Sequence, residues 1–398
     1  MKRLAAACLA LLAGCGGGGG GAPAAVTPPP TPVVTASGAG TVALPPLSST
    51  AALGQKMFND VSLSASGALS CASCHAVAAQ GSAPNALAVQ LGGATGATAG
   101  FRASPSVRYA SLIPEFSVKD GAPRGGYNHD GSARNLADQA AGPLLSAHEM
   151  ANASRADFVA KLRRAAYADE FAGVFGAGIY NDIDETFARA TFALQQYLKQ
   201  DTRLAPFDAK FDAVLRGQAI FSPSEQRGLA LFNDPNKGNC AACHTSSVAQ
   251  DGTHPVFSDF SFHNLGVPRN RALAANKDAA YFDLGVCGRA EFADRADLCG
   301  AFKVPSLRNV ASRKVFFHNG AFTDLREVVR FYARRDTHPA EWYPLGSKFD
   351  DVPEQYRGHV ESKTAPYNRL PGMAPALTEA EIDDIVQFLN TLNDGFRN

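Results

Sequence analysis

Two short motifs contain the residues whose types and spacing could do chemistry. Cys71-Ala-Ser-Cys74-His75 and Cys240-Ala-Ala-Cys243-His244 both follow the pattern C-x-x-C-H. Two thiols three positions apart can each add to a vinyl group of one haem, and the adjacent imidazole can then bind the iron. The pattern predicts two covalent haem c groups, with these attachment cysteines and iron-ligating histidines: Cys71, Cys74, Cys240, Cys243, His75 and His244.

Two other uses of C-x-x-C fit this chain less well. A zinc ribbon places its two cysteine pairs about 15–20 residues apart, whereas these two pairs lie 169 positions apart. A thioredoxin-like site needs one C-x-x-C on a βαβ pattern and no adjacent histidine.

The N-terminus has the pattern of an export signal. Lys2 and Arg3 precede an apolar run of ten residues, and a membrane-spanning helix needs roughly 20, so residues 1–14 are predicted to be a signal peptide. Leu12-Ala13-Gly14-Cys15 resembles the bacterial lipobox, which implies lipidation of Cys15 and stable anchoring by acyl chains. Ordinary cleavage nearby is the alternative.

Residues 15–50 are predicted to be a linker, because Gly, Pro, Ala and Thr dominate and no helical period is present. The expected location is the periplasm, with the protein held at a membrane only by the lipid. Gly16, in place of Asp, favours the outer membrane.

In an exported protein Cys287 and Cys299, twelve positions apart, could form a disulfide; two free buried thiols are the alternative.

The charge balance excludes one class of partner. The chain has 37 Lys and Arg against 37 Asp and Glu, and removing Lys2 and Arg3 leaves 35 against 37. A nucleic-acid-binding protein needs a dense cationic surface, so no nucleic-acid partner is expected.

An internal repeat predicts two similar units. Gly54-x-x-x-Phe58-Asn59-Asp60 precedes the first motif, and Gly228-x-x-x-Phe232-Asn233-Asp234 precedes the second. Helix starts are predicted at Ser222 and Thr378, each followed three residues later by Glu. The predicted fold is mainly α, with two cytochrome c-like haem domains in one chain (51–204 and 205–398), long loops and few strands.

The second ligand of each iron decides the chemistry. Between His75 and residue 128 the chain has no His and no Met, so the first haem is expected to be open on its far face. A distant ligand, His129 or His148, is the alternative.

Longer segments resemble one family. Residues 129–150 (HDGSARNLADQAAGPLLSAHEM), 262–266 (FHNLG), 302–309 (FKVPSLRN) and 317–320 (FHNG) resemble the signatures of the bacterial dihaem cytochrome c peroxidase/MauG family, in the same order. The resemblance implies a peroxidase that reduces H2O2 at the N-terminal haem. It places Gln139, Pro143 and Glu149 on the distal side of that haem, with Glu149 as general base and acid.

Two positions, 332 and 129, differ from the residues that the peroxidases of this family have there. Tyr332 stands where peroxidases have the Met ligand of the second haem, and phenolate favours high oxidation states of iron. The resemblance therefore implies that both irons share the oxidising equivalents, as in a bis-Fe(IV) state. Met373 and a purely structural role for Tyr332 are the alternatives. His129 replaces the family's interhaem Trp and is the candidate for electron transfer between the haems.

The family's calcium site is changed as well. Its Asn ligand falls on Ala103, and its carbonyl donors fall near Arg313 and Val315, so Ca2+ is doubtful here. No motif in this sequence identifies the external electron donor. It could be a small redox protein or a protein substrate. An ordinary cytochrome c peroxidase and a non-catalytic dihaem electron carrier remain alternative functions.

Overall fold

The computed structural model describes residues 44–343 and 347–397. The predicted signal peptide, the lipidation site Cys15 and the predicted linker up to residue 43 lie outside the described residues. Residues 45–398 form one compact unit.

The described part of the chain is mainly helical, which confirms the predicted fold class. The helices are α1 (Ser49–Asn59), α2 (Cys71–Cys74), α3 (Leu136–Leu145), α4 (Arg155–Leu162), α5 (Ala168–Phe175), α6 (Ile183–Gln200), α7 (Lys210–Leu215), α8 (Pro223–Asn233), α9 (Leu325–Arg334) and α10 (Glu379–Asn390). Short 3-10 turns and long loops connect them.

The strands are short and form three separate antiparallel pairs. These are β1 (Leu91–Gly92) with β2 (Thr98–Ala99), β3 (Ser117–Lys119) with β4 (Ala122–Arg124), and β5 (Phe262–His263) with β6 (Phe302–Lys303). None is long enough to form a core of its own.

Both predicted helix starts are confirmed. The Ser222 side chain accepts from the Glu225 N–H and Glu225 accepts from the Ser222 N–H, and Thr378 and Glu381 do the same at α10. Such reciprocal caps satisfy backbone donors that a helix end leaves unpaired.

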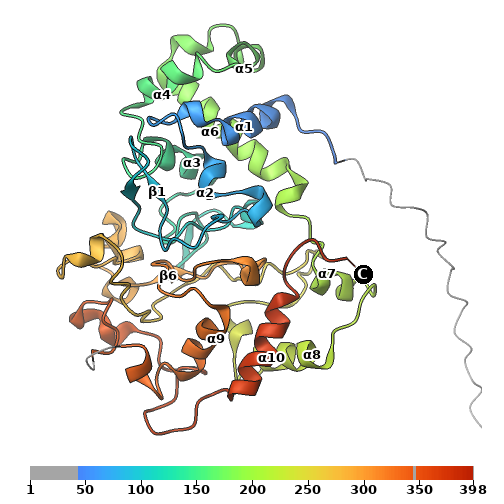
Figure 1. Ribbon diagram of the computed structural model, residues 1–398, viewed down its shortest axis with the longest axis vertical. Helices are drawn as coiled ribbons and strands as arrows, with labels where there is room; N and C mark the ends of the chain where they lie inside the picture. The colour runs from blue at the N-terminus through green and yellow to red at the C-terminus, as the bar shows by residue number, and fades with distance from the viewer. Residues whose placement is uncertain (1–43, 344–346, 398) are drawn as a thin grey trace, which may run out of the picture. The chain divides into compact units, whose positions relative to one another are not determined.

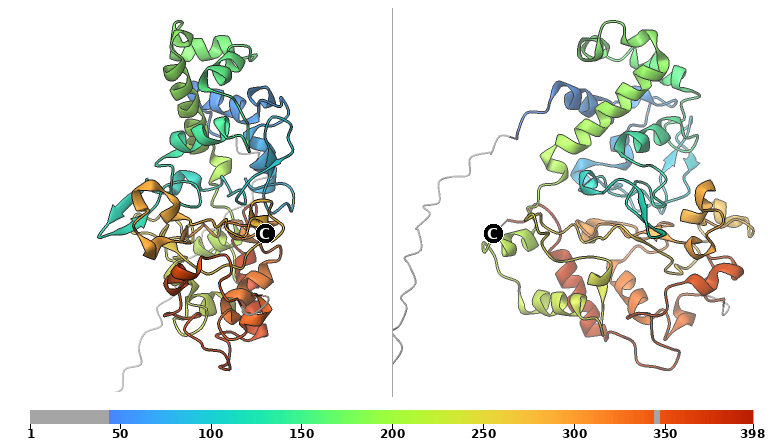
Figure 2. Two further views of the ribbon diagram at one scale, coloured as in Figure 1. Left: turned by 90° about the vertical axis from the view of Figure 1, so that its left-hand side faces the viewer. Right: turned by 180° about the vertical axis from the view of Figure 1, so that it is seen from behind.

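Two hydrophobic cores divide the compact unit. One draws on residues between Leu53 and Leu204, and the other on residues between Phe211 and Leu392. In Figure 1 the blue and green elements make up one half and the yellow to red elements the other, and both views in Figure 2 keep the same division.

Each half contains one close helix crossing, α1 with α6 and α8 with α10 (Figure 1). A Cβ added at Gly54 would lie 2.0 Å from the Ala193 carbonyl oxygen, and one at Gly228 would lie 2.0 Å from that of Asp384. The aromatic residue four positions after each glycine packs on the partner helix, with ring centroids 5.3 Å apart for Phe58 and Tyr197 and 5.2 Å apart for the second pair, Phe232 and Phe388. The repeated sequence therefore encodes the same crossing twice.

Buried ionic contacts tie the two halves together. The Tyr109 hydroxyl donates to Asp394 at 2.5 Å, and Arg108 pairs with the same carboxylate at 2.8 Å. Arg102 pairs with Asp283 at 2.6 Å and with Asp130 at 2.7 Å. We call the region around Arg102, where the halves meet, the seam.

A small third cluster lies beside the seam. It contains the disulfide between Cys287 and Cys299, whose Cα atoms are 4.8 Å apart, and Phe262 of β5. The disulfide closes a loop of short turns that pack on Phe116 and Phe262.

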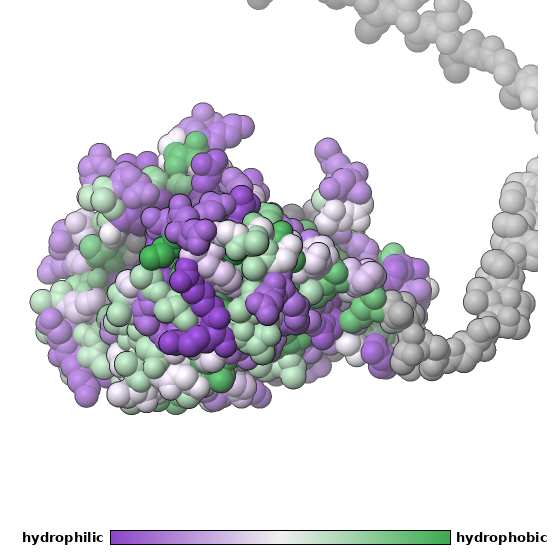
Figure 3. Space-filling view, turned by 90° about the horizontal axis from the view of Figure 1, so that it is seen from above, coloured by the Kyte–Doolittle hydropathy of each residue, from purple (hydrophilic) through white to green (hydrophobic). Residues whose placement is uncertain are grey.

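No helix within the described ranges is long and apolar enough to cross a membrane. On the face seen in Figure 3, hydrophilic residues are spread among small hydrophobic patches.

The helix crossing predicts a large effect of one added methyl group. Gly54→Ala should lower the free energy of unfolding by about 1–3 kcal/mol, because the Cβ would overlap the Ala193 backbone. Chemical denaturation of the purified protein measures this value. Gly173→Ala in α5 is the matched control, because a Cβ there has nothing within 4 Å. This substitution should raise the free energy of unfolding by about 0.5–1 kcal/mol. Equal effects of the two substitutions would contradict the proposed crossing.

Candidate functional site

The first C-x-x-C-H motif forms a single helical turn. The Ser73 hydroxyl accepts from the Ser70 N–H at its start, and the His75 N–H donates to the Cys71 carbonyl at 2.9 Å at its end. Burial lowers the pKa of His75 to about 4, so its imidazole is neutral. Its Nδ1 is buried and has no hydrogen-bond partner among the described residues.

The second motif repeats this turn. The His244 N–H donates to the Cys240 carbonyl at 2.8 Å. Nδ1 of His244 lies 2.9 Å from the Phe257 carbonyl, which orients the ring. Burial also lowers the pKa of His244.

None of the four motif cysteines takes part in a disulfide. Burial raises the pKa of Cys71 and of Cys240 to about 12 and that of Cys243 to about 11. All four side chains, and both histidines, are nevertheless partly accessible. We call the surroundings of each motif, where its cysteines and histidine are partly accessible, the first and the second recess.

This donor set fits haem c. Each recess offers two thiols three positions apart, followed by a neutral imidazole with a free ring nitrogen, as thioether attachment and iron ligation require.

Glu149 lies close enough to the first motif for its charge to act on the thiols there. Its charge contributes to raising the pKa of both Cys71 and Cys74. Strand β1 holds its backbone, because the Gly93 N–H donates to the Glu149 carbonyl at 2.8 Å and a Cβ at Gly92 would lie 2.7 Å from the Glu149 Cα. Its side chain is exposed by area, yet the surrounding protein desolvates it and raises its pKa.

Gln139 and Pro143 both lie on α3, but they point to different neighbours. The Pro143 carbonyl accepts the N–H of Met150, the residue after Glu149, at 3.1 Å. Nε2 of Gln139 lies 3.5 Å from Oδ1 of Asn128. Gln139 therefore lies nearer the seam than the other two residues predicted on the distal side.

His129 lies at the seam. Its Nε2 is 2.8 Å from the Ala103 carbonyl, and its own carbonyl accepts the Lys303 N–H at 2.7 Å. Burial and the charges of Arg102, Lys303 and Arg313 lower its pKa to about 4.

Tyr332 of α9 faces the second recess. Burial raises its pKa, and the thiols of Cys240 and Cys243 raise it further. Tyr367 lies beside it, with ring centroids 5.8 Å apart, and the buried Tyr367 hydroxyl has no hydrogen-bond partner among the described residues. Met373, the alternative ligand, is 44% exposed, and its sulfur accepts the Leu370 N–H at 3.3 Å.

The predicted calcium donors do not form a calcium site. Ala103 offers no side-chain oxygen, and the Val315 carbonyl accepts a hydrogen bond from Arg313. Within the described ranges no group of three or more His, Cys, Asp and Glu side chains is placed to hold a metal ion. Calcium prefers six to eight oxygens, so these residues do not fit it.

Several residues of the two recesses carried no interpretable sequence signal. Nε2 of His263 lies 3.6 Å from Sγ of Cys243, and the F-H-N motif pointed only to the segment that contains it. Tyr367 and Arg335, whose guanidinium lies 4.1 Å over the Tyr367 ring, belong to no motif.

A buried ion pair holds the segment that orients His244. Arg308 and Asp212 are fully buried and 2.6 Å apart, and Nδ1 of His254 is 2.6 Å from the same carboxylate. Nε of Arg308 also donates to the Pro255 carbonyl at 2.8 Å, two residues before Phe257. Arg308, from the sequence segment 302–309, thus holds the backbone whose Phe257 carbonyl orients His244.

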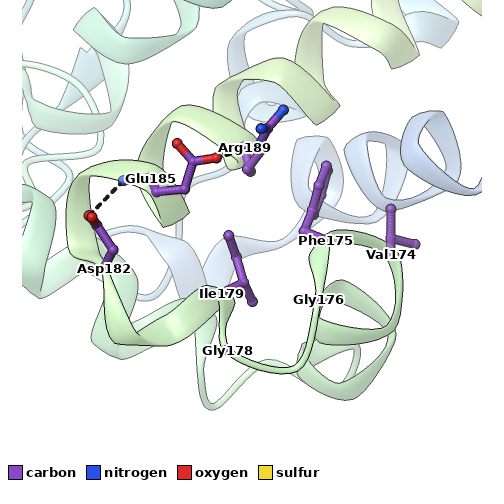
Figure 4. A pocket seen from close by; sticks show the side chains of 8 residues that line it. All are labelled: Val174, Phe175, Gly176, Gly178, Ile179, Asp182, Glu185 and Arg189. Carbon is purple, nitrogen blue, oxygen red and sulfur yellow. Dashed lines mark hydrogen bonds and ion pairs between the residues drawn. The ribbon is translucent and has the colours of Figure 1, made fainter.

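A hollow of about 540 Å³ between α5 and α6 lies apart from these residues. Figure 4 shows its lining, in which Asp182 accepts from the Glu185 N–H and Arg189 points toward Glu185. It contains none of the predicted site residues.

Two C-x-x-C-H turns, each in its own helical half and each with a neutral histidine, define a two-haem protein. The family model described as di-haem cytochrome c peroxidase matches residues 48–220. The methylamine utilization protein MauG of Paracoccus denitrificans is 35% identical over 372 residues, which cover 91% of this chain and 93% of that protein. The cytochrome c551 peroxidase of Nitrosomonas europaea is 29% identical over 71% of this chain and 72% of its own.

The same likeness holds among solved structures. The diheme peroxidase BthA of Burkholderia thailandensis E264 matches with a TM-score of 0.82 and 40% identity, over 88% of this chain and 87% of that one. The chain therefore belongs to the dihaem cytochrome c peroxidase/MauG family. It is a peroxidase with two haem cofactors, and H2O2 is its substrate.

The buried ion pair predicts a strong effect of one neutral substitution. Asp212→Asn leaves the buried Arg308 charge without its counter-ion and should lower the free energy of unfolding by about 3–5 kcal/mol. Denaturation measures the loss. The control, Asp184→Asn, removes the same charge from the exposed pair with Arg155 and should cost less than about 1 kcal/mol. A loss below about 1 kcal/mol at Asp212 would contradict the structural role.

Proposed function

We propose that the first haem, held by Cys71, Cys74 and His75, reduces H2O2, and that both haems share the oxidising equivalents. The second haem would be held by Cys240, Cys243, His244 and Tyr332. When bound at these residues, the two haems would supply the electrons that reduce H2O2 and would store the oxidising equivalents between them. The observation that carries the proposal is a carboxylate, Glu149, close enough to the first motif for its charge to act on Cys71 and Cys74.

Three features support an open far face at the first haem. Residues 76–128 contain neither His nor Met. Nδ1 of His148 lies 2.9 Å from the Ala99 carbonyl, and its ring packs on Phe101 with centroids 4.4 Å apart. His129 uses its Nε2 on the Ala103 carbonyl. Both alternative ligands are thus held by other contacts.

Glu149 is suited to move the proton. As a carboxylate it takes a proton from one oxygen of bound H2O2, and as a carboxylic acid it returns that proton to the departing oxygen. Burial raises its pKa toward the working pH, which makes both transfers easier. Pro143 helps to position the segment that carries Glu149, because its carbonyl accepts the Met150 N–H.

Glu149→Gln should slow the reaction of the ferric protein with H2O2 by about 10²- to 10⁴-fold, because the amide cannot accept the proton. Stopped-flow absorbance measures the rate, and an unchanged ferric spectrum shows that both haems are in place. Asp138→Asn on the exposed side of α3 is the control and should react normally.

The same carboxylate predicts a pH dependence. Glu149 accepts a proton only when ionised, so the rate should fall as the pH drops through its pKa. Because that pKa is raised, the midpoint should lie above the ordinary carboxyl value of about 4.3. The Glu149→Gln variant should lack this midpoint, and a midpoint that persists in the variant would assign it to another group.

Tyr332 is the proposed second ligand of the second haem. It is enclosed near both motif cysteines, whereas Met373 is 44% exposed with its sulfur bonded locally. Binding to iron would release the phenol proton, and the Tyr367 hydroxyl, which is buried without a partner among the described residues, could then donate a hydrogen bond to the phenolate. A hard anionic ligand favours the higher oxidation states.

Tyr332→Phe should change the electron paramagnetic resonance signal of the second ferric haem, because phenylalanine cannot bind iron. Met373→Leu should leave that signal unaltered. The opposite pattern would show that Met373 is the ligand, and two unaltered spectra would exclude both residues.

His129 is proposed to lie on the electron path between the haems. Burial and three nearby cations disfavour a positive charge on its ring. Electrons are therefore proposed to tunnel past His129 without oxidising it.

The periplasm is the proposed location, with attachment through a lipid on Cys15, because covalent haem c, an apolar leader and a lipobox-like segment occur together. The external donor could be a small redox protein or a protein substrate. The name of the Nitrosomonas europaea relative favours a small cytochrome as a second candidate. Steady-state turnover with reduced cytochrome c separates an ordinary cytochrome c peroxidase, which turns over fast, from a MauG-like enzyme, which does not.

A further inference from the structure

Arg313 places a guanidinium group at the seam. Its Nη2 donates to the Ser104 carbonyl at 3.1 Å, its Nε to the Val315 carbonyl at 3.3 Å, and its Nη1 to the Ser82 hydroxyl at 3.4 Å. Ser82 follows the first haem motif, Ser104 lies beside Ala103, and Val315 leads to His318. One side chain therefore joins three segments that are distant in the sequence.

The charge of Arg313 has no carboxylate partner in the part of the chain that the structure describes. Burial lowers its pKa to about 10, so it stays protonated at neutral pH. It acts on both neighbouring histidines, His75 and His129, since its charge lowers the pKa of each. The oxygens that accept its hydrogen bonds are two backbone carbonyls and one hydroxyl, so all three are neutral.

One acceptor of Arg313, the Val315 carbonyl, is among the oxygens to which the family resemblance assigns calcium, and another, the Ser104 carbonyl, follows Ala103, where the family has its Asn ligand. Ala103 cannot supply the side-chain oxygen that the resemblance requires, and the Val315 carbonyl already accepts the Arg313 Nε–H. The Ala103 backbone is also engaged, because its N–H donates to the His318 carbonyl at 2.7 Å and its carbonyl meets His129. A calcium ion here would have to displace the guanidinium and would meet no carboxylate in return.

We propose that the Arg313 guanidinium takes the place of the calcium ion, as a cation built into the chain at the seam between the two haem sites. Three hydrogen bonds hold the guanidinium in position. Because the group is part of the chain, a chelator cannot remove its charge. The protein therefore keeps a positive charge between its haems without binding calcium. This inference does not depend on which haem reacts with peroxide.

Chelation of the full chain with both haems tests the first half of the inference. The purified protein is treated with EGTA, passed over a chelating resin and assayed for calcium. Its ferric electron paramagnetic resonance spectrum and melting temperature are then recorded without and with added calcium chloride. We expect less than a tenth of a calcium per chain and no change in either measurement. Stoichiometric retained calcium, or a spectrum that chelation alters and calcium restores, would overturn the proposal.

Substitutions test the second half. Arg313→Gln keeps a hydrogen-bond donor but removes the charge, so the midpoint potentials of the haems should shift to lower values, because a nearby cation favours the ferrous state. Arg313→Lys keeps the charge and should stay closer to the parent protein. Lys314→Gln removes an exposed charge one residue away and should shift the potentials less than Arg313→Gln does.

Unchanged potentials in Arg313→Gln would overturn the charge role. If that variant does not fold with both haems, Arg313→Lys decides the matter. A lysine variant that binds calcium or responds to chelation would contradict the proposal, and one that stays calcium-independent supports it.

Discussion

Close backbone contact between two helices is the constraint on which both haem sites depend. At Gly54 and at Gly228 the partner helix approaches so closely that no Cβ fits. The aromatic residue one turn later packs on the same partner, and the C-x-x-C-H turn begins 13 positions after Phe58 and 8 positions after Phe232. Because both halves use the same crossing, the two recesses present the same donors: two thiols and a neutral imidazole.

The difference between the recesses arises from what faces the donors. Glu149 faces the first, held by the backbone of β1, and Tyr332 faces the second, held by α9 beside Tyr367. A carboxylate suits proton transfer, whereas a buried phenol suits an oxidised metal. Two copies of one fold can therefore divide the work of peroxide reduction.

Local features of the chain could be predicted from the sequence. The cysteine motifs, the helix starts at Ser222 and Thr378 and the repeated Gly54 and Gly228 signal depend on residues within a few positions of one another. The mainly helical fold followed from them. The partners of the two glycines could not be predicted, because Ala193 and Asp384 are more than a hundred positions away. The Arg313 contacts were equally hidden, since two of its three acceptors are backbone carbonyls, which leave no trace in the residue types.

The central claim is an open iron face beside Glu149 in the first recess. The ferric electron paramagnetic resonance spectrum of the untreated protein, recorded before and after adding cyanide, tests it most directly. The account predicts a high-spin signal from one haem that becomes low-spin with cyanide, while the signal of the other haem stays the same. Two purely low-spin signals that cyanide does not change would contradict it.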